Sequence, residues 1–363
     1  MSDSAKKTPL YEEHEKAGGR IVEFAGWSLP VQFEGIRQEH ECVRQQVGLF
    51  DVSHMGEFRV KGPKSLETLQ WVTTNDVSLL ENGQAHYTLL TNETGGIVDD
   101  LIVYCLEKEQ DYLLCVNAAN IEKDFKWIVD HNRGADLSNE SDHWAQIAVQ
   151  GPSALKLMER IFPGVENVKP FHFKVDGCEE APIYLARTGY TGEPGFEIFI
   201  ENSGAPGLWR ELLQVGEDLG ARPIGLGARD TLRTEMKYSL YGQEIDDTTN
   251  PYEAGLGWVV RPEAKDFVGK SEVLKVKEMG LKSKLVGFVT TERGIPRTGY
   301  KLFSFDKEEI GRVTSGTVSP TSGDSIGIGY VATAHAAVDS EFFVEIRGKM
   351  VKAKVVKTPF IQK

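Results

Sequence analysis

Two adjacent carboxylates, Asp99 and Asp100, lie inside an apolar segment, residues 95–104, with the sequence GGIVDDLIVY. The glycines indicate a turn that leads into a strand with apolar residues on both sides of its pleat, so we expect burial on both faces. At least one aspartate is then held away from bulk water. A buried carboxylate needs a hydrogen-bond donor, a proton that neutralises it, or a ligand that supplies the partner. Alternation alone does not tell which aspartate faces a cavity, and a paired structural aspartate stays an alternative.

Other isolated polar side chains stand in glycine-rich or apolar segments along the chain. Together with Asp100, they are Asn117, Tyr190, Glu197, Arg229 and Tyr238. Amide, phenol, carboxylate and guanidinium groups offer both hydrogen-bond donors and acceptors to a ligand. The set therefore suits a site that binds a polar heterocycle.

Motifs of other chemistries are incomplete or missing. Residues 269–271, GKS, match the end of a phosphate-binding P-loop, but Ala264 stands where that motif has glycine. The three glycines within 189–195 match no dinucleotide fingerprint, so they indicate tight turns or a backbone that approaches a ligand. Neither G-x-S-x-G nor H-E-x-x-H occurs. Since no second ligand-type residue stands at metal-binding spacing from His54, we expect a hydrogen-bonded structural histidine and no metal site.

The composition predicts a soluble globular protein of more than one domain. The chain has 363 residues, of which 40% are hydrophobic and 26% charged. Its net charge of -13 argues against nucleic acid as a partner, because phosphate binding needs a basic field. The sequence has no run of eighteen apolar residues and no signal peptide, so we expect no membrane association and a location in a bacterial cytoplasm. The cysteines form no C-x-x-C pair, which favours reduced thiols over disulfides or a zinc site.

The hydrophobic spacing predicts α+β modules followed by a small all-β module. Helical spacing runs over 36–47 and stops at Gly48, and Asn117 is placed to cap a helix that runs to about His131. From Lys284 onward, short strands and turns indicate a small antiparallel barrel or jelly roll. Strands are predicted before it near 58–61, 86–90, 97–105, 112–116, 145–149, 172–175 and 182–187.

Short segments, in order along the chain, resemble those of the T-protein family, the aminomethyltransferases of the glycine cleavage system. They are FAGW at 24–27, GLFDVSHMGE at 48–57, GGIVDDL at 95–101, VNAAN at 116–120, RTGYTGE at 187–193, LGARD at 226–230, YGQE at 241–244 and TSG at 314–316. The resemblance runs from about Thr8 to Phe360 and so covers nearly the whole chain. Several matches of this length in sequence order are highly specific.

The resemblance implies a fold of class α+β, a three-domain cloverleaf around a central cavity that holds tetrahydrofolate. Two domains are then α+β, with ferredoxin-like or Greek-key antiparallel sheets, and the third is a small C-terminal β-barrel or jelly roll. The resemblance implies these domain boundaries. Residues 1–52 and 140–260 together form a discontinuous α+β domain that binds folate, and residues 53–139 form the α+β domain that carries the catalytic aspartate. Residues 275–363 form the C-terminal antiparallel barrel. The implied reaction transfers the one-carbon unit of S-aminomethyl-dihydrolipoyl H-protein to tetrahydrofolate, which yields 5,10-methylenetetrahydrofolate, ammonia and dihydrolipoyl H-protein.

The family's essential aspartate matches Asp100, which the resemblance places near N10 of the folate. A carboxylate there can orient the weakly basic arylamine and take its proton as the ring closes. Glu197 matches the glutamate that anchors the pterin. A carboxylate can accept hydrogen bonds from the pterin 2-amino group and N3–H at the same time. Arg229 could pair with an acidic group, hydrogen-bond a ring oxygen, or form an ion pair at the start of its helix. The resemblance assigns these further residues to the folate cavity: Met55, Tyr87, Val98, Asn117, Tyr190, Arg229 and Tyr238.

The implied partners are tetrahydrofolate as co-substrate and the lipoylated H-protein, with no metal, flavin, nucleic acid or membrane. Because the family implies an acidic carrier and this chain is itself acidic, docking needs a local basic rim. Arg293, Arg297 and Lys301 are candidates, and solvated loop charges are the alternative. The chain departs from the family pattern at residues 321–322 and at Gly327, where local packing rather than chemistry is affected.

Two other folate proteins stay as alternatives. The folate module of a demethylating flavin dehydrogenase would follow a dinucleotide-binding domain, but the sequence contains no G-x-G-x-x-G. A folate-binding RNA-modification or iron–sulfur assembly factor of related fold would carry a lysine-glycine-cysteine-tyrosine motif. None of Cys42, Cys105, Cys115 and Cys178 lies in such a motif.

Overall fold

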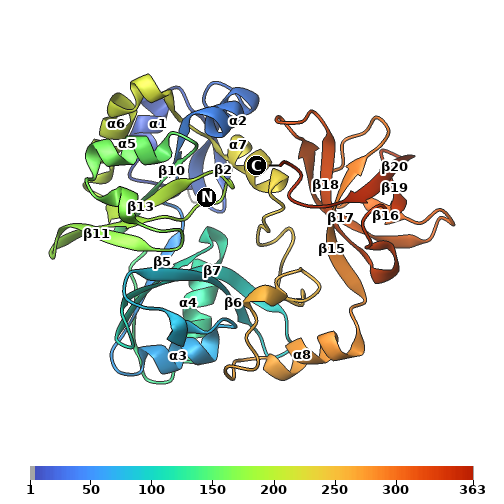
Figure 1. The fold of residues 1–363 in the computed structure, drawn as a ribbon, viewed down its shortest axis with the longest axis horizontal. Helices are drawn as coiled ribbons and strands as arrows, with labels where there is room; N and C mark the ends of the chain where they lie inside the picture. The colour runs from blue at the N-terminus through green and yellow to red at the C-terminus, as the bar shows by residue number, and fades with distance from the viewer. Residues whose placement is uncertain (1–4, 363) are drawn as a thin grey trace. The chain divides into compact units, whose positions relative to one another are not determined.

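The computed structural model describes residues 5–362 (Figure 1). Contacts between Cα atoms divide the chain into two compact units. The first unit holds residues up to Leu69, Val77–Tyr87 and Leu101–Asp230. The second unit holds Gln70–Asp76, Thr88–Asp100 and the chain from Thr231 onward. The three-domain boundaries stay a prediction, and their outer ends at residues 1 and 363 lie outside the described residues.

The N-terminal part of the first unit forms a small sheet and two helices. Strand β3 (Trp27–Gln32) lies between β1 (Lys6–Lys7), to which it is parallel, and β2 (Arg20–Phe24), to which it is antiparallel. Helix α1 (Tyr11–Lys16) connects β1 to β2, and helix α2 (Ile36–Gln45) follows β3. The prediction that α2 extends to Val47 is wrong, because the backbone leaves the helix at Gln46 and Val47 begins a fully buried strand.

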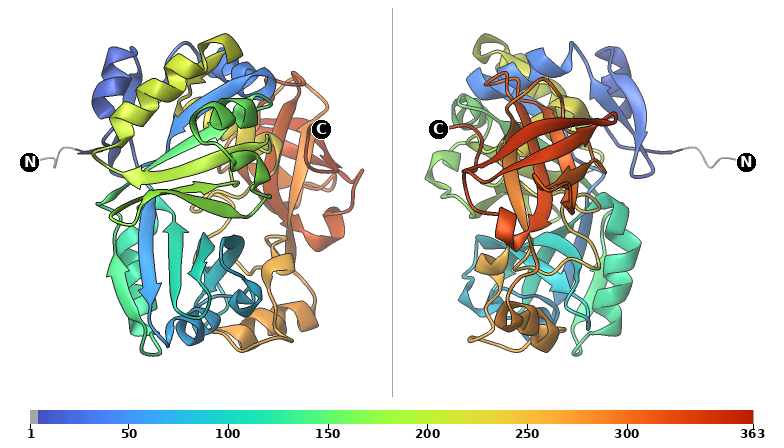
Figure 2. Two further views of the ribbon diagram at one scale, coloured as in Figure 1. Left: turned by 60° about the vertical axis from the view of Figure 1, so that its left-hand side comes forward. Right: turned by 90° about the vertical axis from the view of Figure 1, so that its right-hand side faces the viewer.

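A six-stranded sheet is the centre of the first unit, with the strand order β11-β12-β13-β10-β4-β14. Its pairs are antiparallel except for β14, which is parallel to β4. Helices α5 (Ala154–Ile161) and α6 (Ala205–Val215) cover one face (Figure 2). Side chains such as Leu157, Trp209 and Ile198 form a hydrophobic core there. The strands are β4 (Val47–Asp51), β10 (Trp144–Gln150), β11 (Phe173–Cys178), β12 (Ala181–Ala186), β13 (Gly195–Glu201) and β14 (Ala221–Pro223).

A five-stranded antiparallel sheet has the order β6-β7-β8-β5-β9. Its strands are β6 (Gln84–Thr91), β7 (Ile97–Glu107), β8 (Asp111–Val116), β5 (Gly56–Lys61) and β9 (Asp136–Asn139), with helices α3 (Ser65–Val72) and α4 (Ile121–Asp130) between them in the chain. We call the aromatic-rich core that joins this sheet to the uncovered face of the six-stranded sheet the intersheet cluster. It comprises Ala85, Tyr104, Leu113, Cys115, Trp144, Phe173, Tyr184, Ala186 and Phe199.

The C-terminal part of the second unit is a closed barrel with the order β15-β18-β17-β16-β19-β20. All its strand pairs are antiparallel, and side chains such as Phe288, Leu302 and Phe342 fill its interior. Helix α7 (Leu226–Glu235) runs from the first unit into the second, and α8 (Lys270–Met279) precedes the barrel. The barrel strands are β15 (Ser283–Thr290), β16 (Lys301–Phe303), β17 (Glu309–Val318), β18 (Ser325–Ala332), β19 (Glu341–Ile346) and β20 (Lys349–Val356).

The α+β class and the small C-terminal barrel are thereby confirmed. Single-turn 3-10 helices complete the elements at Val77–Leu79, Ala118–Asn120, Val165–Asn167, Glu217–Leu219, Gly257–Val259 and Thr333–His335. Within residues 5–362, no helix is long and apolar enough to cross a bilayer. Three of the four cysteines are buried, and all four are free thiols.

Candidate active site

Glu197 lies on β13 with its side chain on the face of the sheet opposite the helices. Its neighbours Phe196 and Ile198 belong to the core under α5 and α6, and Phe199, two positions on, belongs to the intersheet cluster. The hydroxyl of Thr188 donates a hydrogen bond of 2.5 Å to Glu197 Oε2. Burial raises the pKa of Glu197 above its ordinary range, and this hydrogen bond and the charge of Arg229 oppose part of the rise.

Arg229 and Tyr190 lie next to each other in the first unit. The guanidinium carbon of Arg229, on α7, is 4.7 Å from the ring centroid of Tyr190, which is within the range of a cation–π interaction. Arg229 is half-buried, and its positive charge acts on the buried carboxyl group of Glu197. A contact of Arg229 with a ligand oxygen stays a prediction.

Tyr104 and Met55 line the same layer as Glu197. The hydroxyl of Tyr104 is 3.4 Å from Thr188 Oγ1. Burial raises the pKa of Tyr104 well above the usual range, so its phenol stays neutral. Met55 packs against the intersheet cluster to which Tyr104 belongs. The turn that leads to Met55 is held by Asp51, which accepts hydrogen bonds from the Ser53 amide at 3.0 Å and the Thr8 hydroxyl at 2.6 Å.

The glycine-rich loop after β12 is packed around the side chain of Gln150. Gln150 Nε2 donates to the Thr188 carbonyl at 3.1 Å, and the Thr191 hydroxyl donates to Gln150 Oε1 at 2.9 Å. A Cβ atom at Gly189 or Gly195 would lie 2.1 Å or 2.4 Å from the amide group of Gln150. These two glycines are therefore explained by the approach of a side chain, rather than by the turn or the ligand approach that the sequence suggested.

His54 is buried, but the prediction that it is a hydrogen-bonded histidine is wrong for one ring nitrogen. Within the described part of the chain, its Nδ1 atom has no hydrogen-bond partner, and its ring contacts the edge of Phe24 at a centroid distance of 5.8 Å. Burial lowers its pKa to about 3, and the charge of Arg229 adds to this effect. His54 is therefore a neutral side chain, and residues 5–362 contain no cluster of three or more metal-ligating side chains.

Tyr87 and Asn117 belong to the five-stranded sheet and the turn that follows it. Both are half-buried, Tyr87 on β6 and Asn117 directly after β8. Asn117 precedes the short 3-10 helix Ala118–Asn120, and its side chain makes no capping hydrogen bond there among the described residues. The predicted side-chain cap is thus wrong.

In the second unit, the two aspartates of β7 differ in exposure. Asp99 is fully buried and Asp100 half-buried, which confirms that at least one is held away from water. Val98 is buried as well, with 3% exposed. The entering turn is fixed by Asn92, whose Oδ1 accepts from the Gly96 amide at 2.9 Å and whose Nδ2 donates to the Asp247 carbonyl at 2.9 Å.

Tyr238 and the candidate docking cations also lie in the second unit. Tyr238 follows α7 and is 37% exposed. Arg293, Arg297 and Lys301 are exposed as expected. Two of them already have partners, because Arg297 donates to the Gly316 carbonyl at 3.0 Å and Lys301 pairs with Glu309 at 2.7 Å.

Comparisons with known proteins decide the family. Residues 10–264 match the GCVT N-terminal domain, and residues 284–362 match the glycine cleavage T-protein C-terminal barrel domain. The chain belongs to the glycine cleavage T-protein family. It is 60% identical over 99% of its length to the whole aminomethyltransferase of Bdellovibrio bacteriovorus, and 48% identical over 98% of its length to the whole aminomethyltransferase of Halothermothrix orenii. The glycine cleavage system aminomethyltransferase T of Bartonella henselae has a similar structure, with a TM-score of 0.93, 35% identity, and coverage of 99% of this chain and 98% of that one.

The first unit thus contains four of the residues that the resemblance to T-proteins assigned to the site. Two further residues that support the site were not predicted from the sequence. Met55 packs against the intersheet cluster. The charge of Arg229 acts on Glu197, and its guanidinium lies next to the ring of Tyr190. Sequence reasoning missed Thr188 and Gln150, although Thr188 stands in the motif RTGYTGE directly after a strand that pairs with β13. A hydroxyl placed next to a strand that carries a carboxylate would have been the signal. The sequence around Gln150 contained no such signal, because the role of Gln150 depends on two glycines that follow it by 39 and 45 positions.

Proposed function

We propose that this T-protein family member is an aminomethyltransferase that depends on tetrahydrofolate. It transfers the one-carbon unit of S-aminomethyl-dihydrolipoyl H-protein to N5 and N10 of tetrahydrofolate. The carbon leaves sulfur and nitrogen, and the two folate N–H protons go to the leaving amine and the leaving thiolate. The products are 5,10-methylenetetrahydrofolate, ammonia and dihydrolipoyl H-protein. The names of the relatives support the transferase activity, and the setting of Glu197 supports the co-substrate.

The observation that carries the proposal is a buried carboxyl group beside the intersheet cluster, whose raised pKa is opposed by one hydrogen bond and one nearby positive charge. Glu197 receives one hydrogen bond from Thr188 on Oε2, and the positive charge of Arg229 acts on it. A carboxylate held in this way can accept the 2-amino group and N3–H of a pterin in bidentate fashion. Tyr190, Arg229 and Met55 supply an aromatic face, N–H donors and a polarizable apolar contact for the same ring.

Asp100 is proposed as the catalytic residue. Its half-buried position on β7 follows the fixed turn at Asn92, so its carboxylate has a defined direction and some access to a ligand. In the proposed site it orients N10 of the folate and takes the N10 proton as the methylene bridge closes. Tyr87, Val98, Asn117 and Tyr238 complete the folate cavity in this proposal, which involves no metal or flavin.

The experiment that tests the function measures ammonia release from aminomethyl-loaded lipoyl H-protein, with and without tetrahydrofolate. Wild type should release ammonia in a folate-dependent way. Asp100→Asn should keep the dissociation constant for tetrahydrofolate within about threefold but lower turnover by about 100-fold or more, as expected for loss of a general base. The control is Asp306→Asn, which changes an exposed loop aspartate and should turn over normally.

Two outcomes would contradict the proposal at different points. Unchanged turnover in Asp100→Asn removes Asp100 from the chemistry. Wild-type protein that binds tetrahydrofolate but releases no ammonia would instead point to a folate-binding factor of the same fold.

A further inference from the structure

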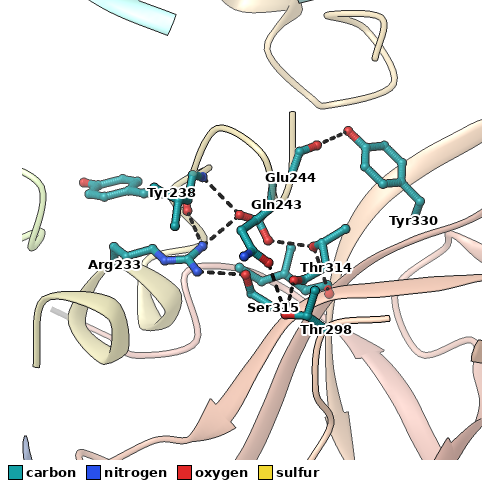
Figure 3. A network of polar contacts seen from close by, with 10 residues as sticks. Arg233, Tyr238, Gln243, Glu244, Thr298, Thr314, Ser315 and Tyr330 are labelled. Atoms are coloured by element: carbon teal, nitrogen blue, oxygen red, sulfur yellow. Dashed lines mark hydrogen bonds and ion pairs between the residues drawn. The ribbon is translucent and has the colours of Figure 1, made fainter. Parts of the chain in front are cut away.

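A buried ion pair joins the end of α7 to the loop that follows it (Figure 3). Arg233 Nη1 lies 2.8 Å from Glu244 Oε2, and the side chains are only 3% and 0% exposed. Burying two charges costs several kcal/mol of desolvation, and apolar residues of similar volume often stabilise a protein at least as well. The pair therefore calls for an explanation beyond stability.

Hydroxyl groups of the barrel complete the hydrogen bonding of this pair. The Thr314 hydroxyl donates to Glu244 Oε1 at 2.6 Å, and Arg233 Nη2 donates to Ser315 Oγ at 2.8 Å, both on β17. On β18, the Tyr330 hydroxyl donates to the Glu244 carbonyl at 2.7 Å. Since β17 and β18 are paired strands of the closed barrel, these anchor points are rigid.

The same groups fix the backbone of the segment 238–244. Arg233 Nη1 donates to the Tyr238 carbonyl at 3.2 Å, and the Leu240 amide donates to Glu244 Oε2 at 3.0 Å. The Tyr238 carbonyl and the Leu240 amide are thus each tied to a buried charged side chain. The ring of Tyr238 nevertheless points away from the network, as Figure 3 shows, and 37% of the residue is exposed.

A rigid backbone that carries an exposed aromatic ring is the arrangement expected of a ligand contact that is preorganised before binding. We infer that Arg233, Glu244 and the barrel hydroxyls of Thr314, Ser315 and Tyr330 form a positioning network that presents Tyr238 to the folate. This inference rests on the proposed function, in which Tyr238 lines the folate cavity. It gives the barrel a part in co-substrate binding, through residues that do not themselves touch the ligand.

A double-mutant cycle on the full-length protein tests the network. Thr314→Val removes the donor to Glu244 and keeps the side-chain shape, and we expect the dissociation constant for tetrahydrofolate to rise by about three- to tenfold. The KM for tetrahydrofolate should rise in parallel while kcat changes by less than about twofold, because the network touches no reacting atom. Thr314→Ser, which keeps the hydroxyl, should restore both values.

The decisive comparison uses Tyr238→Ala. If the network acts through Tyr238, Thr314→Val should have no further effect on folate affinity in the Tyr238→Ala background. Thr290→Val is the control, because the Thr290 hydroxyl at the end of β15 donates to the Gly294 carbonyl in the loop that follows the strand and belongs to no part of the network. Tyr330→Phe removes a second anchor and gives the same test if Thr314→Val does not fold.

The outcomes separate the inference from the function on which it rests. Effects of Thr314→Val and Tyr238→Ala that simply add, or a loss that Thr290→Val reproduces, would overturn the network as a positioning device while wild-type activity stands. Absence of tetrahydrofolate binding in wild type would overturn the proposed function and the inference with it.

Discussion

At the scale of single residues, Thr188 opposes the rise that burial causes in the pKa of Glu197. Burial raises the pKa of Glu197, and the Thr188 hydrogen bond opposes this rise. If Glu197 anchors the pterin as proposed, only its ionised form accepts both pterin donors, so the KM for tetrahydrofolate should increase as the pH falls through this pKa. Thr188→Val should move that increase to higher pH and raise KM by about three- to tenfold at neutral pH. The measurement is KM as a function of pH for wild type and variant.

Thr188→Ser serves as the control for that prediction, because it keeps the hydroxyl and should return the pH profile to that of wild type. A Thr188→Val profile that is parallel to the wild-type profile, with KM raised equally at every pH, would mean that Thr188 affects packing and not the charge of Glu197.

At the scale of elements, strand β5 carries a carboxyl group whose burial weakens the fold. Glu57 is 1% exposed, and neither of its oxygens has a hydrogen-bond partner among residues 5–362. Burial raises its pKa well above the usual range, and the charge of Glu140 raises it further. The folded state therefore holds a proton that the unfolded state releases, so stability falls as the pH rises from the ordinary glutamate range through the raised pKa.

Glu57→Gln should remove this loss. We expect the free energy of unfolding to exceed that of wild type by about 2 kcal/mol near pH 8 and to be similar near pH 4 to 5, where glutamate is protonated in both states. Urea unfolding at the two pH values measures the difference. Glu23→Gln on β2 is the matched control, since Glu23 is an exposed strand residue and its replacement should change stability little at either pH.

Most helices and strands could be predicted from the sequence, because the spacing of apolar residues and the glycines at turns reflect local backbone conformation. The buried strand of Asp99 and the C-terminal barrel are examples. The end of α2 was missed because Val47 suits either a helix or a buried strand, and its pairing with β14 decides for the strand. The pKa of His54 and the pKa of Glu197 depend in part on the charge of Arg229, which is far away in sequence and comes close only through tertiary packing.

At the scale of the whole molecule, recognition of a protein partner has to overcome a net charge of -13. If Arg293, Arg297 and Lys301 form a basic docking rim for an acidic carrier, reversing all three charges should raise the KM for H-protein by about tenfold at low salt, with a smaller effect at high salt. The KM for tetrahydrofolate should not change. Steady-state kinetics at two ionic strengths provide the measurement.

The control for docking reverses three exposed cations of the first unit, Arg20, Lys156 and Lys169. This control variant has the same net charge as the docking variant. A normal KM for H-protein in the control would show that the position of the three cations, and not the net charge, determines docking. The rim proposal fails if both triple variants behave alike, since net charge alone would then explain the change.

The packing of Gln150 between Gly189 and Gly195 has a consequence for how this sequence can diverge. The glutamine amide occupies the space that a side chain at either glycine would need. At Gly189 the three nearest atoms all belong to Gln150, so a side chain there becomes tolerable only with a shorter residue at position 150, and that change breaks the bonds that hold Thr188 and Thr191. At Gly195 a Cβ atom would also lie 2.5 Å from the Val149 carbonyl, so a shorter residue at position 150 does not free that position. Gln150 and Gly189 are therefore expected to change together or to stay fixed, Gly195 is expected to stay glycine, and the loop that supports Glu197 has few single-step routes to another sequence.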